Sequence, residues 1–147
     1  MTGFNHAASG ALIGKFLPLP IALPVALGSH FVLDKMPHYG IPHHHRDSKF
    51  FWKLFTTADV IAAFGLGGLA IYFHRYAMFA CGFVACSPDF IWLARVVRTK
   101  SFDLSQNEHR FTKWHVRIQN WERPWGIWIE LPLSVGMFYL IWNFGFH

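Results

Sequence analysis

Two histidines and an aspartate lie close together at the end of the first apolar stretch of the chain. In Ser29-His30-Phe-Val-Leu-Asp34-Lys-Met-Pro-His38, the residues His30 and Asp34 are four positions apart, so on a helix they share one face. His38 follows directly after a proline. Imidazole nitrogens and carboxylate oxygens are ligands of zinc and similar divalent ions. The segment therefore predicts one half of a metal site.

Each later apolar stretch carries a single acid, and these are Asp59, Asp89 and Glu130. A carboxylate at the centre of a membrane helix costs roughly 2.5–3.5 kcal/mol on insertion scales, and less near the interface. Such a group is tolerated when it is paired, hydrated or bound to a cation. We therefore expect these acids to serve the same site as His30 and Asp34. In that site Asp89 is a metal ligand, and Asp59 or Glu130 is a general base or orients a ligand.

Helix capping is the alternative interpretation for two of these acids. Asp59 follows Thr56-Thr57, where it would begin a helix, although the apolar sequence continues through it from Phe50. Asp89 follows Ser87-Pro88, which is typical of the first turn of a new helix. Capping and metal binding are compatible roles at Asp89.

Composition places these residues in a membrane. The chain has 147 residues, of which 53% are hydrophobic and only 14% charged, whereas about a quarter are charged in soluble domains. Four apolar runs lack Lys and Arg and approach the roughly 20 residues that cross a bilayer; they cover residues 16–33, 54–73, 76–94 and 124–146. The sequence predicts an all-α polytopic membrane helical bundle, forming one domain over residues 1–147. A very apolar soluble helical bundle is the alternative.

Basic residues concentrate in segments 35–53 and 95–123, while the second and third runs are joined only by His74-Arg75. The positive-inside rule therefore places both basic segments in the cytoplasm and the tight turn outside. Asp34, Asp59, Asp89 and Glu130 then fall at a similar depth near the cytoplasmic interface. The net charge of +5 comes mostly from these two segments and forms no stripe for nucleic acid, so no nucleic-acid partner is expected.

The first apolar run contains three prolines, and proline disrupts a helix interior; they are Pro18, Pro20 and Pro24. One interpretation is a single kinked helix that crosses the membrane. The other is a re-entrant helical hairpin of residues 7–17 and 21–36, which is tolerated at membrane depth when it is buried in protein. We favour the hairpin, because it brings His6 near His30 and Asp34.

Residues 108–124 read as an amphipathic helix at the cytoplasmic interface. His115, Gln119 and Glu122 are spaced by four and three residues, so they share one face. We expect these three residues to complete the site from this side, with His115 as a metal ligand; an exposed polar face is the alternative for Gln119 and Glu122. In the second run, three glycines permit close helix packing within one chain or in a homo-oligomer: Gly65, Gly67 and Gly68.

Three fragments resemble small bacterial inner-membrane proteins known as membrane-bound metal-dependent hydrolases: His6-Ala-Ala-Ser-Gly-Ala, Ser29-His30-xxx-Asp34-xx-Pro-His38 and Ser87-Pro-Asp89. More distantly, His-xxx-Asp is similar to the helical zinc sites of bacterial phospholipase C and single-strand nucleases. The resemblance implies that His6, His30, Asp34 and Asp89 are metal ligands and that His38 is a ligand or an acid–base group. It also implies a multi-pass protein of the bacterial inner membrane.

The chain departs from the phospholipase pattern at the position of its second metal-binding helix. His115-Val-Arg-Ile-Gln119 has a glutamine where that pattern has a carboxylate, so a three-zinc site is not expected. His-Glu-xx-His and the phosphate-binding loop Gly-xxxx-Gly-Lys-Ser/Thr are both absent, which argues against a zincin protease and a P-loop NTPase.

These observations favour metal-assisted hydrolysis, most simply with zinc, of a phosphoester or another amphiphilic or lipid substrate at the membrane surface. The alternatives are a transporter or channel for protons or divalent cations, and a non-catalytic membrane scaffold. The outer halves of the apolar runs contain almost no ionisable groups, which argues against a polar path across the membrane. Membrane lipid and a divalent ion are the expected partners.

Overall fold

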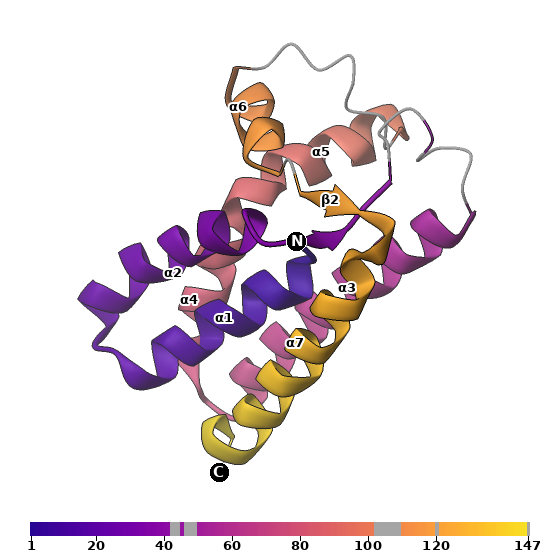
Figure 1. Cartoon of the computed structure of the whole chain (residues 1–147). Helices are drawn as coiled ribbons and strands as arrows, with labels where there is room; N and C mark the ends of the chain where they lie inside the picture. The colour runs from indigo at the N-terminus through magenta and orange to yellow at the C-terminus, as the bar shows by residue number, and fades with distance from the viewer. Residues whose placement is uncertain (42–44, 46–49, 102–109, 120, 147) are drawn as a thin grey trace.

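The computed structural model describes residues 1–41, 45, 50–101, 110–119 and 121–146, which form mainly helices (Figure 1). The longer helices are α1 (Gly3–Phe16), α2 (Leu19–Asp34), α3 (Phe50–Tyr72), α4 (Tyr76–Cys86), α5 (Phe90–Thr99), α6 (Arg110–Ile118) and α7 (Ile127–Leu140). Three stretches within the described residues are long and apolar enough to cross a bilayer, namely Phe50–Tyr72, Tyr76–Thr99 and Pro124–Gly145. The prediction of an all-α membrane helical bundle is confirmed.

The helices α1 and α2 form a hairpin, as favoured from the sequence, and the first apolar run supplies its turn and its second helix. Leu17 has extended backbone angles, because the residue before a proline is driven out of the helical region, and Pro18 lies in the turn. Pro20 fits the first turn of α2, where its missing N–H has no intrahelical partner to lose. The two helices pack against each other and return the chain to the end where it began (Figure 1). Each is too short to cross a bilayer alone.

Small residues allow α1 to lie directly against α4. A side chain at Gly10 would collide with the backbone carbonyl of Cys81, and one at Gly14 would collide with that of Ala77. On the facing helix, a Cβ at Gly82 would lie 3.0 Å from the carbonyl oxygen of Ala7. Close backbone approach through small residues is a common way to pack helices in membranes. This interface fixes where α1 presents His6.

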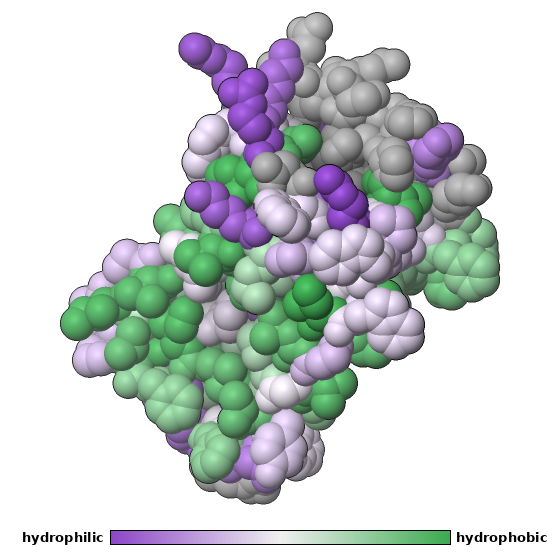
Figure 2. Space-filling model, viewed as in Figure 1, coloured by the Kyte–Doolittle hydropathy of each residue, from purple (hydrophilic) through white to green (hydrophobic). Residues whose placement is uncertain are grey.

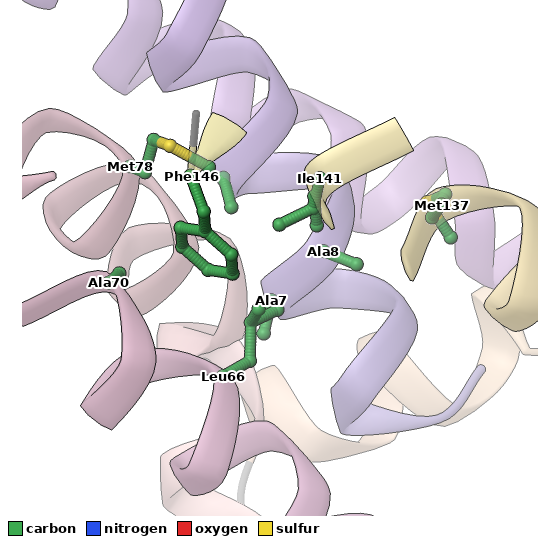
Figure 3. Close-up of a cluster of buried hydrophobic side chains, with 9 residues drawn as sticks. Ala7, Ala8, Leu66, Ala70, Met78, Met137, Ile141 and Phe146 are labelled. Carbon is green, nitrogen blue, oxygen red and sulfur yellow. The ribbon is translucent and has the colours of Figure 1, made fainter. Parts of the chain in front are cut away.

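The apolar core lies between α1, α3, α4 and the C-terminal helices (Figure 3). Its buried members are Ala7, Ala8, Ala11, Leu66, Ala70, Met78, Met137, Ile141 and Phe146. Ile141 belongs to η4, a π-helical turn over Ile141–Gly145 that continues α7. Alanines from α1 fill the centre of the cluster, so α1 is enclosed by the three candidate spans.

Two carboxylates hold the start of α1 in place. Asp59 of α3 accepts hydrogen bonds from the backbone N–H groups of Gly3 at 2.7 Å and Phe4 at 2.8 Å. Glu130 of α7 accepts backbone N–H groups from Thr2 and, at 2.9 Å, from Tyr39. The first N–H groups of a helix have no partner within it and carry its positive dipole end. The two acids supply that partner.

The third apolar run is helical throughout, but its α-helix is interrupted by a 3₁₀ turn at Ser87-Pro88-Asp89. These residues form η2 (Ser87–Asp89), a short 3₁₀ segment between α4 and α5. Proline is favoured in the first turn of a helix, so α5 restarts there with Asp89 immediately before it. The sequence predicted this break, and it brings Asp89 to the end of α4 that faces α1 and α2.

The polar end of the molecule carries α6 and two very short strands. β1 (His38–Tyr39) and β2 (Glu122–Arg123) pair in parallel, with His38 opposite Glu122. η3 (Pro124–Gly126), a 3₁₀ turn, leads from β2 into α7. The helix expected over residues 108–124 is therefore shorter: α6 ends at Ile118 and β2 occupies Glu122–Arg123, while residues 108–109 and 120 lie outside the described residues.

Apolar side chains dominate the visible surface of the helical bundle, and hydrophilic ones gather toward the end that carries α6 (Figure 2). Gly65 and Gly68 lie on the exposed surface of α3, and among the described residues nothing comes within 4 Å of a Cβ built at either. These two glycines therefore do not mediate close packing within the described chain. Packing between chains stays a prediction for them.

Candidate metal centre

Asp34 lies at the centre of a cluster of three imidazoles. Its Oδ1 is 3.1 Å from Nε2 of His6, while its Oδ2 is 3.1 Å from Nε2 of His30 and 2.6 Å from Nε2 of His115. All four side chains are buried. The i,i+4 pair of His30 and Asp34 thus shares one face of α2, as the spacing predicted.

Asp89 borders this cluster from η2. Its carboxylate oxygens lie 3.9 Å from Nε2 of His6, 3.9 Å from Nε2 of His30 and 4.0 Å from Nε2 of His115. Its side chain is 26% exposed, so it closes the centre on the more open side. Two overlapping groups have ligand atoms within 4.8 Å of one another: His6, His30 and Asp34, and then His30, Asp89 and His115.

The five residues come from four separate elements. α1 supplies His6, α2 supplies His30 and Asp34, η2 supplies Asp89, and α6 supplies His115. The hairpin places His6 and His30 side by side, with stacked rings whose centroids are 3.9 Å apart. The centre therefore depends on both the proline turn of the hairpin and the return of α6.

A backbone hydrogen bond fixes the orientation of the His30 ring. Nδ1 of His30 lies 2.8 Å from the carbonyl oxygen of Ala85, and a carbonyl only accepts, so Nδ1 carries the hydrogen. In the neutral ring, Nε2 then presents a lone pair to Asp34 and His115. Metal-binding histidines almost always donate their other N–H to a carbonyl or a carboxylate in this way.

Nε2 of His30 also lies 2.9 Å from Nε2 of His115, beside the Asp34 carboxylate. Two imidazole nitrogens and a carboxylate oxygen repel one another unless a proton or a metal ion lies among them. A tetrahedral zinc shell with bonds of about 2.0–2.1 Å has ligand atoms about 3.3 Å apart. The separations of 3.1 Å from Asp34 to His6 and His30 are close to that value, whereas the 2.6 Å separation from Asp34 to His115 is that of a hydrogen bond. Three imidazoles with two carboxylates are a donor set that zinc accepts.

Other donors reach the same carboxylate. The amino group of Met1 lies 2.6 Å from Oδ1 of Asp34, and Nε2 of Gln119 donates to Oδ2 at 3.1 Å. Burial opposes the charge of Asp34, but the ammonium group of Met1 and the imidazole of His115 outweigh it and hold the pKa of this carboxyl well below its usual range. Burial also lowers the pKa of His6, against the attraction of Asp34. Both groups are thus in the forms that bind metal.

Asp59 and Glu130 belong to neither of the two groups that could hold a metal ion. Their carboxylate oxygens accept the backbone N–H groups at the start of α1 and at Tyr39, as described above. Asp59 also lies on the wall of a neighbouring cavity. The structure gives both acids an anchoring role; a catalytic role for them stays a prediction.

His38 also lies outside the two ligand groups. Its Nδ1 donates to the carbonyl oxygen of Met36 at 2.8 Å, and its Nε2 lies 3.8 Å from Oε1 of Glu122 across the β1–β2 pair. Among the described residues Nε2 has no hydrogen-bond partner. Burial and the ammonium group of Met1 lower the pKa of His38 to about 4, so its ring is neutral at ordinary pH.

A cavity of about 150 Å³ lies beside the centre. Asp89, His115 and Gln119 form part of its wall, and His38 and Glu122 form another part. The rest is largely apolar and aromatic, and includes Tyr39, Trp52, Phe55, Phe90 and Trp92. The arrangement offers a small apolar space with metal-binding groups on one side and an imidazole on the other.

Gln119 and Glu122, which the sequence placed on the face of His115 as residues that complete the site, contact Asp34 and lie near His38, respectively. Gln119 lies four residues after His115, so the helical spacing already placed it on the same face. Glu122 lies near His38 because the two-residue strands β1 and β2 pair, and no sequence pattern predicts strands as short as these.

The chain matches no family model, no curated protein and no solved structure. The resemblance to membrane-bound hydrolases accordingly stays a prediction from the residues. Support for a function comes from the geometry of the centre.

Proposed function

We propose that the protein is a membrane-embedded metal-dependent hydrolase whose substrate is a phosphoester or another amphiphilic molecule. The observation that carries the proposal is the convergence of His6, His30, Asp34, Asp89 and His115 from four elements. The hydrogen bond from His30 to Ala85 adds the outer support that metal-binding imidazoles need.

In this proposal the five side chains hold one or two divalent ions, zinc being the most suitable for their nitrogen and oxygen atoms. A bound zinc ion would polarise a phosphoryl or carbonyl oxygen and make water a better nucleophile. Gln119 orients Asp34 through its amide hydrogen bond. His38 lies on the wall of the cavity, and among the described residues its Nε2 has no hydrogen-bond partner, so in this proposal it accepts a proton from water.

Basic side chains favour an anionic substrate. Arg95 and Arg98 lie on α5, Lys113 and Arg117 on α6, and Arg123 on β2, all on elements at the polar end of the molecule. Phosphate and carboxylate groups are the natural partners of such cations. By the positive-inside rule, this end faces the cytoplasm, and we place the protein in the bacterial inner membrane with its centre at the cytoplasmic interface.

Transport is less well supported than hydrolysis. After Asp59, residues 60–72 of α3 contain no Asp, Glu, Lys, Arg or His, and neither do residues 76–86 of α4 or 131–145. Intramembrane ionisable groups mark ion pathways, and here they are confined to one end of the bundle. A metal-free ionic network is the other competing interpretation, because the amino group of Met1 already lies against Asp34.

Metal analysis of the detergent-purified chain tests the proposal. Wild-type protein should bind zinc, and His30→Ala and Asp34→Ala should each bind it more than about 100-fold more weakly, because removing a ligand costs more than removing its outer support. Hydrolysis of a chromogenic phosphodiester should fall with zinc content. An ionic network or a scaffold would bind no zinc even in the wild type, and that result would overturn the proposal.

His74→Asn is the matched control. His74 lies in the turn between α3 and α4, hydrogen-bonded to the Tyr76 hydroxyl, at the opposite end of α4 from Asp89. It has a positive φ of 55°, which asparagine tolerates better than alanine. This variant should keep its zinc and its activity. Equal zinc loss in His74→Asn and His30→Ala would show that the metal is bound non-specifically.

A further inference from the structure

A second, larger cavity lies between α3 and α4, with α1 at its base. It measures about 400 Å³, and its wall includes Gly68 and Ile71 of α3, Phe79 and Phe83 of α4, and Ala7 of α1. Among the described residues that line it, none carries a charge. We call this space the α3–α4 groove.

The groove adjoins the cavity beside the metal centre. Four residues line both spaces and form the boundary between them: Ala63, Phe64, Cys86 and Phe90. The two spaces are therefore neighbours, as a molecule with one end beside Asp89 and His115 and its other end in the groove would require. The first cavity has polar groups on its wall, whereas the second is apolar.

The groove also opens onto the surface that a bilayer would cover. Its walls belong to two of the three candidate spans, Phe50–Tyr72 and Tyr76–Thr99. Phe64 is 68% exposed and Phe83 is 54% exposed, although both are large apolar side chains. In a membrane, hydrocarbon covers such side chains, so a lipid chain can enter from the side without passing through water.

We infer that the α3–α4 groove binds the hydrocarbon chain of the substrate, so that the substrate is a membrane lipid whose head group reaches the metal centre. The inference rests on the proposed function and specifies its substrate class. The basic residues of α5 and α6 favour an anionic head group. Packing along the groove holds the chain by many weak contacts, and the head group supplies the specificity.

Gly68 offers a way to fill the groove without touching the centre. No described residue comes within 4 Å of a Cβ built at Gly68, so a larger side chain fits the fold and projects into open space. Gly65 is the matched control, because a Cβ there is equally unobstructed and Gly65 lines neither cavity. Both glycines lie on α3, three residues apart.

The test uses the full chain in lipid nanodiscs with phosphatidylglycerol whose palmitoyl chain carries a photoactivatable diazirine. Labelled residues are identified by mass spectrometry. Label on Phe79 and Phe83 is compared with label on Val135 and Tyr139, which are exposed on α7 and report ordinary bilayer lipid. In Gly68→Leu, we expect the ratio of groove label to α7 label to fall about tenfold, which corresponds to a loss of about 1.4 kcal/mol in the free energy of lipid binding to the groove.

Gly65→Leu should leave that ratio unchanged, and both variants should keep wild-type zinc content and be at least as stable as the wild type in thermal unfolding. An unchanged ratio in Gly68→Leu overturns the inference. So does a change in oligomeric state in that variant, measured by light scattering, because the groove would then be a contact between copies of the chain.

The labelling result is independent of the metal result. If the wild type binds no zinc but the groove is labelled and Gly68→Leu loses the label, the proposed hydrolase fails while lipid binding in the groove stands. If zinc binding and phosphodiester hydrolysis are present but the groove is not labelled above α7, only the inference about the groove fails.

Discussion

The two faces of α4 are packed in opposite ways. Toward α1, added side chains at Gly10 and Gly14 would collide with backbone carbonyls of α4. Toward α3, a groove remains open, and Gly68 on its wall has no described atom within 4 Å of an added Cβ. Glycines thus serve close contact on one side and leave open space on the other.

The difference separates a rigid part of the molecule from an adaptable one. The tightly packed side ends at His6 and at the Ala85 carbonyl that orients His30, so it holds the proposed ligands. Metal sites need ligands fixed to a fraction of an ångström, which a close-packed interface provides. A flexible hydrocarbon chain needs only a long apolar space, which the groove provides.

The largest effect is expected from breaking the tight side. Gly10→Leu should destabilise the protein by about 3 kcal/mol and abolish zinc binding, because a leucine cannot fit against the backbone of Cys81 without moving α1. Thermal unfolding in detergent and zinc analysis measure both effects.

Gly28→Leu is the control for this change. It lies on the exposed surface of α2, and no described residue is within 4 Å of a Cβ built there. It should retain its stability and its zinc. If Gly10→Leu behaved like Gly28→Leu, the close α1–α4 interface would be refuted.

A smaller effect on zinc binding is expected from lowering the pH. It should distinguish the metal-binding groups on the α1 side of α4 from the α3–α4 groove on its other side. Protonation of an imidazole prevents metal binding. Burial lowers the pKa of His6, so its ring stays neutral below its ordinary pKa of about 6.5. Zinc should therefore be retained as the pH falls through about 6.5 and be released only at lower pH. Zinc content after dialysis at a series of pH values measures this.

The same pH series should leave lipid labelling of the groove unchanged until zinc is released, because no charged residue lines the described groove. Release of half of the zinc above pH 6.5 would contradict the assignment of buried His6 as a ligand. A gradual change in labelling above that pH would show that ionisable groups act on the groove.

The smallest effect is expected from alanine on the open side. Gly65→Ala and Gly68→Ala should stabilise the protein by about 0.5–1 kcal/mol, because alanine favours the helix and meets no neighbour in the described structure. Gly14→Ala should instead destabilise it, since its Cβ would collide with Ala77. Thermal unfolding compares the three. Destabilisation by Gly68→Ala would mean that another chain fills the groove.

Much of the fold followed from local patterns. Apolar length predicted the helices over residues 54–73, 76–94 and 124–146, because a bilayer requires about that length. Pro18 predicted the turn of the hairpin, since a proline in a helix interior removes a hydrogen bond and clashes with the preceding turn. The same signal at Pro24 did not end a helix, because Pro24 lies inside α2. Choosing between a kinked helix and a hairpin needed the long-range packing of α1 against α4. The β1–β2 pair was missed because two residues carry no periodicity.

The candidate site was predictable in part, because some of its residues also follow local sequence patterns. The spacing of His30 and Asp34 is local, and so is the break before Asp89. The acids Asp59 and Glu130 had the same signal as Asp89, an isolated charge near the end of an apolar run. Sequence alone does not distinguish an acid that faces a metal centre from one that accepts the first N–H groups of a helix.

The amino-acid sequence by itself determined the class of the protein and the chemical groups available to it, because apolar length and helical spacing are properties of neighbouring residues. Only the tertiary structure decided which groups meet. His6, His30 and His115 are separated by 24 and 85 residues along the chain, yet the rings of His6 and His30 stack, and Nε2 of His30 lies 2.9 Å from Nε2 of His115 beside Asp34. It also decided which glycines are covered, because a glycine has no side chain to reveal whether its neighbour is another helix or open space.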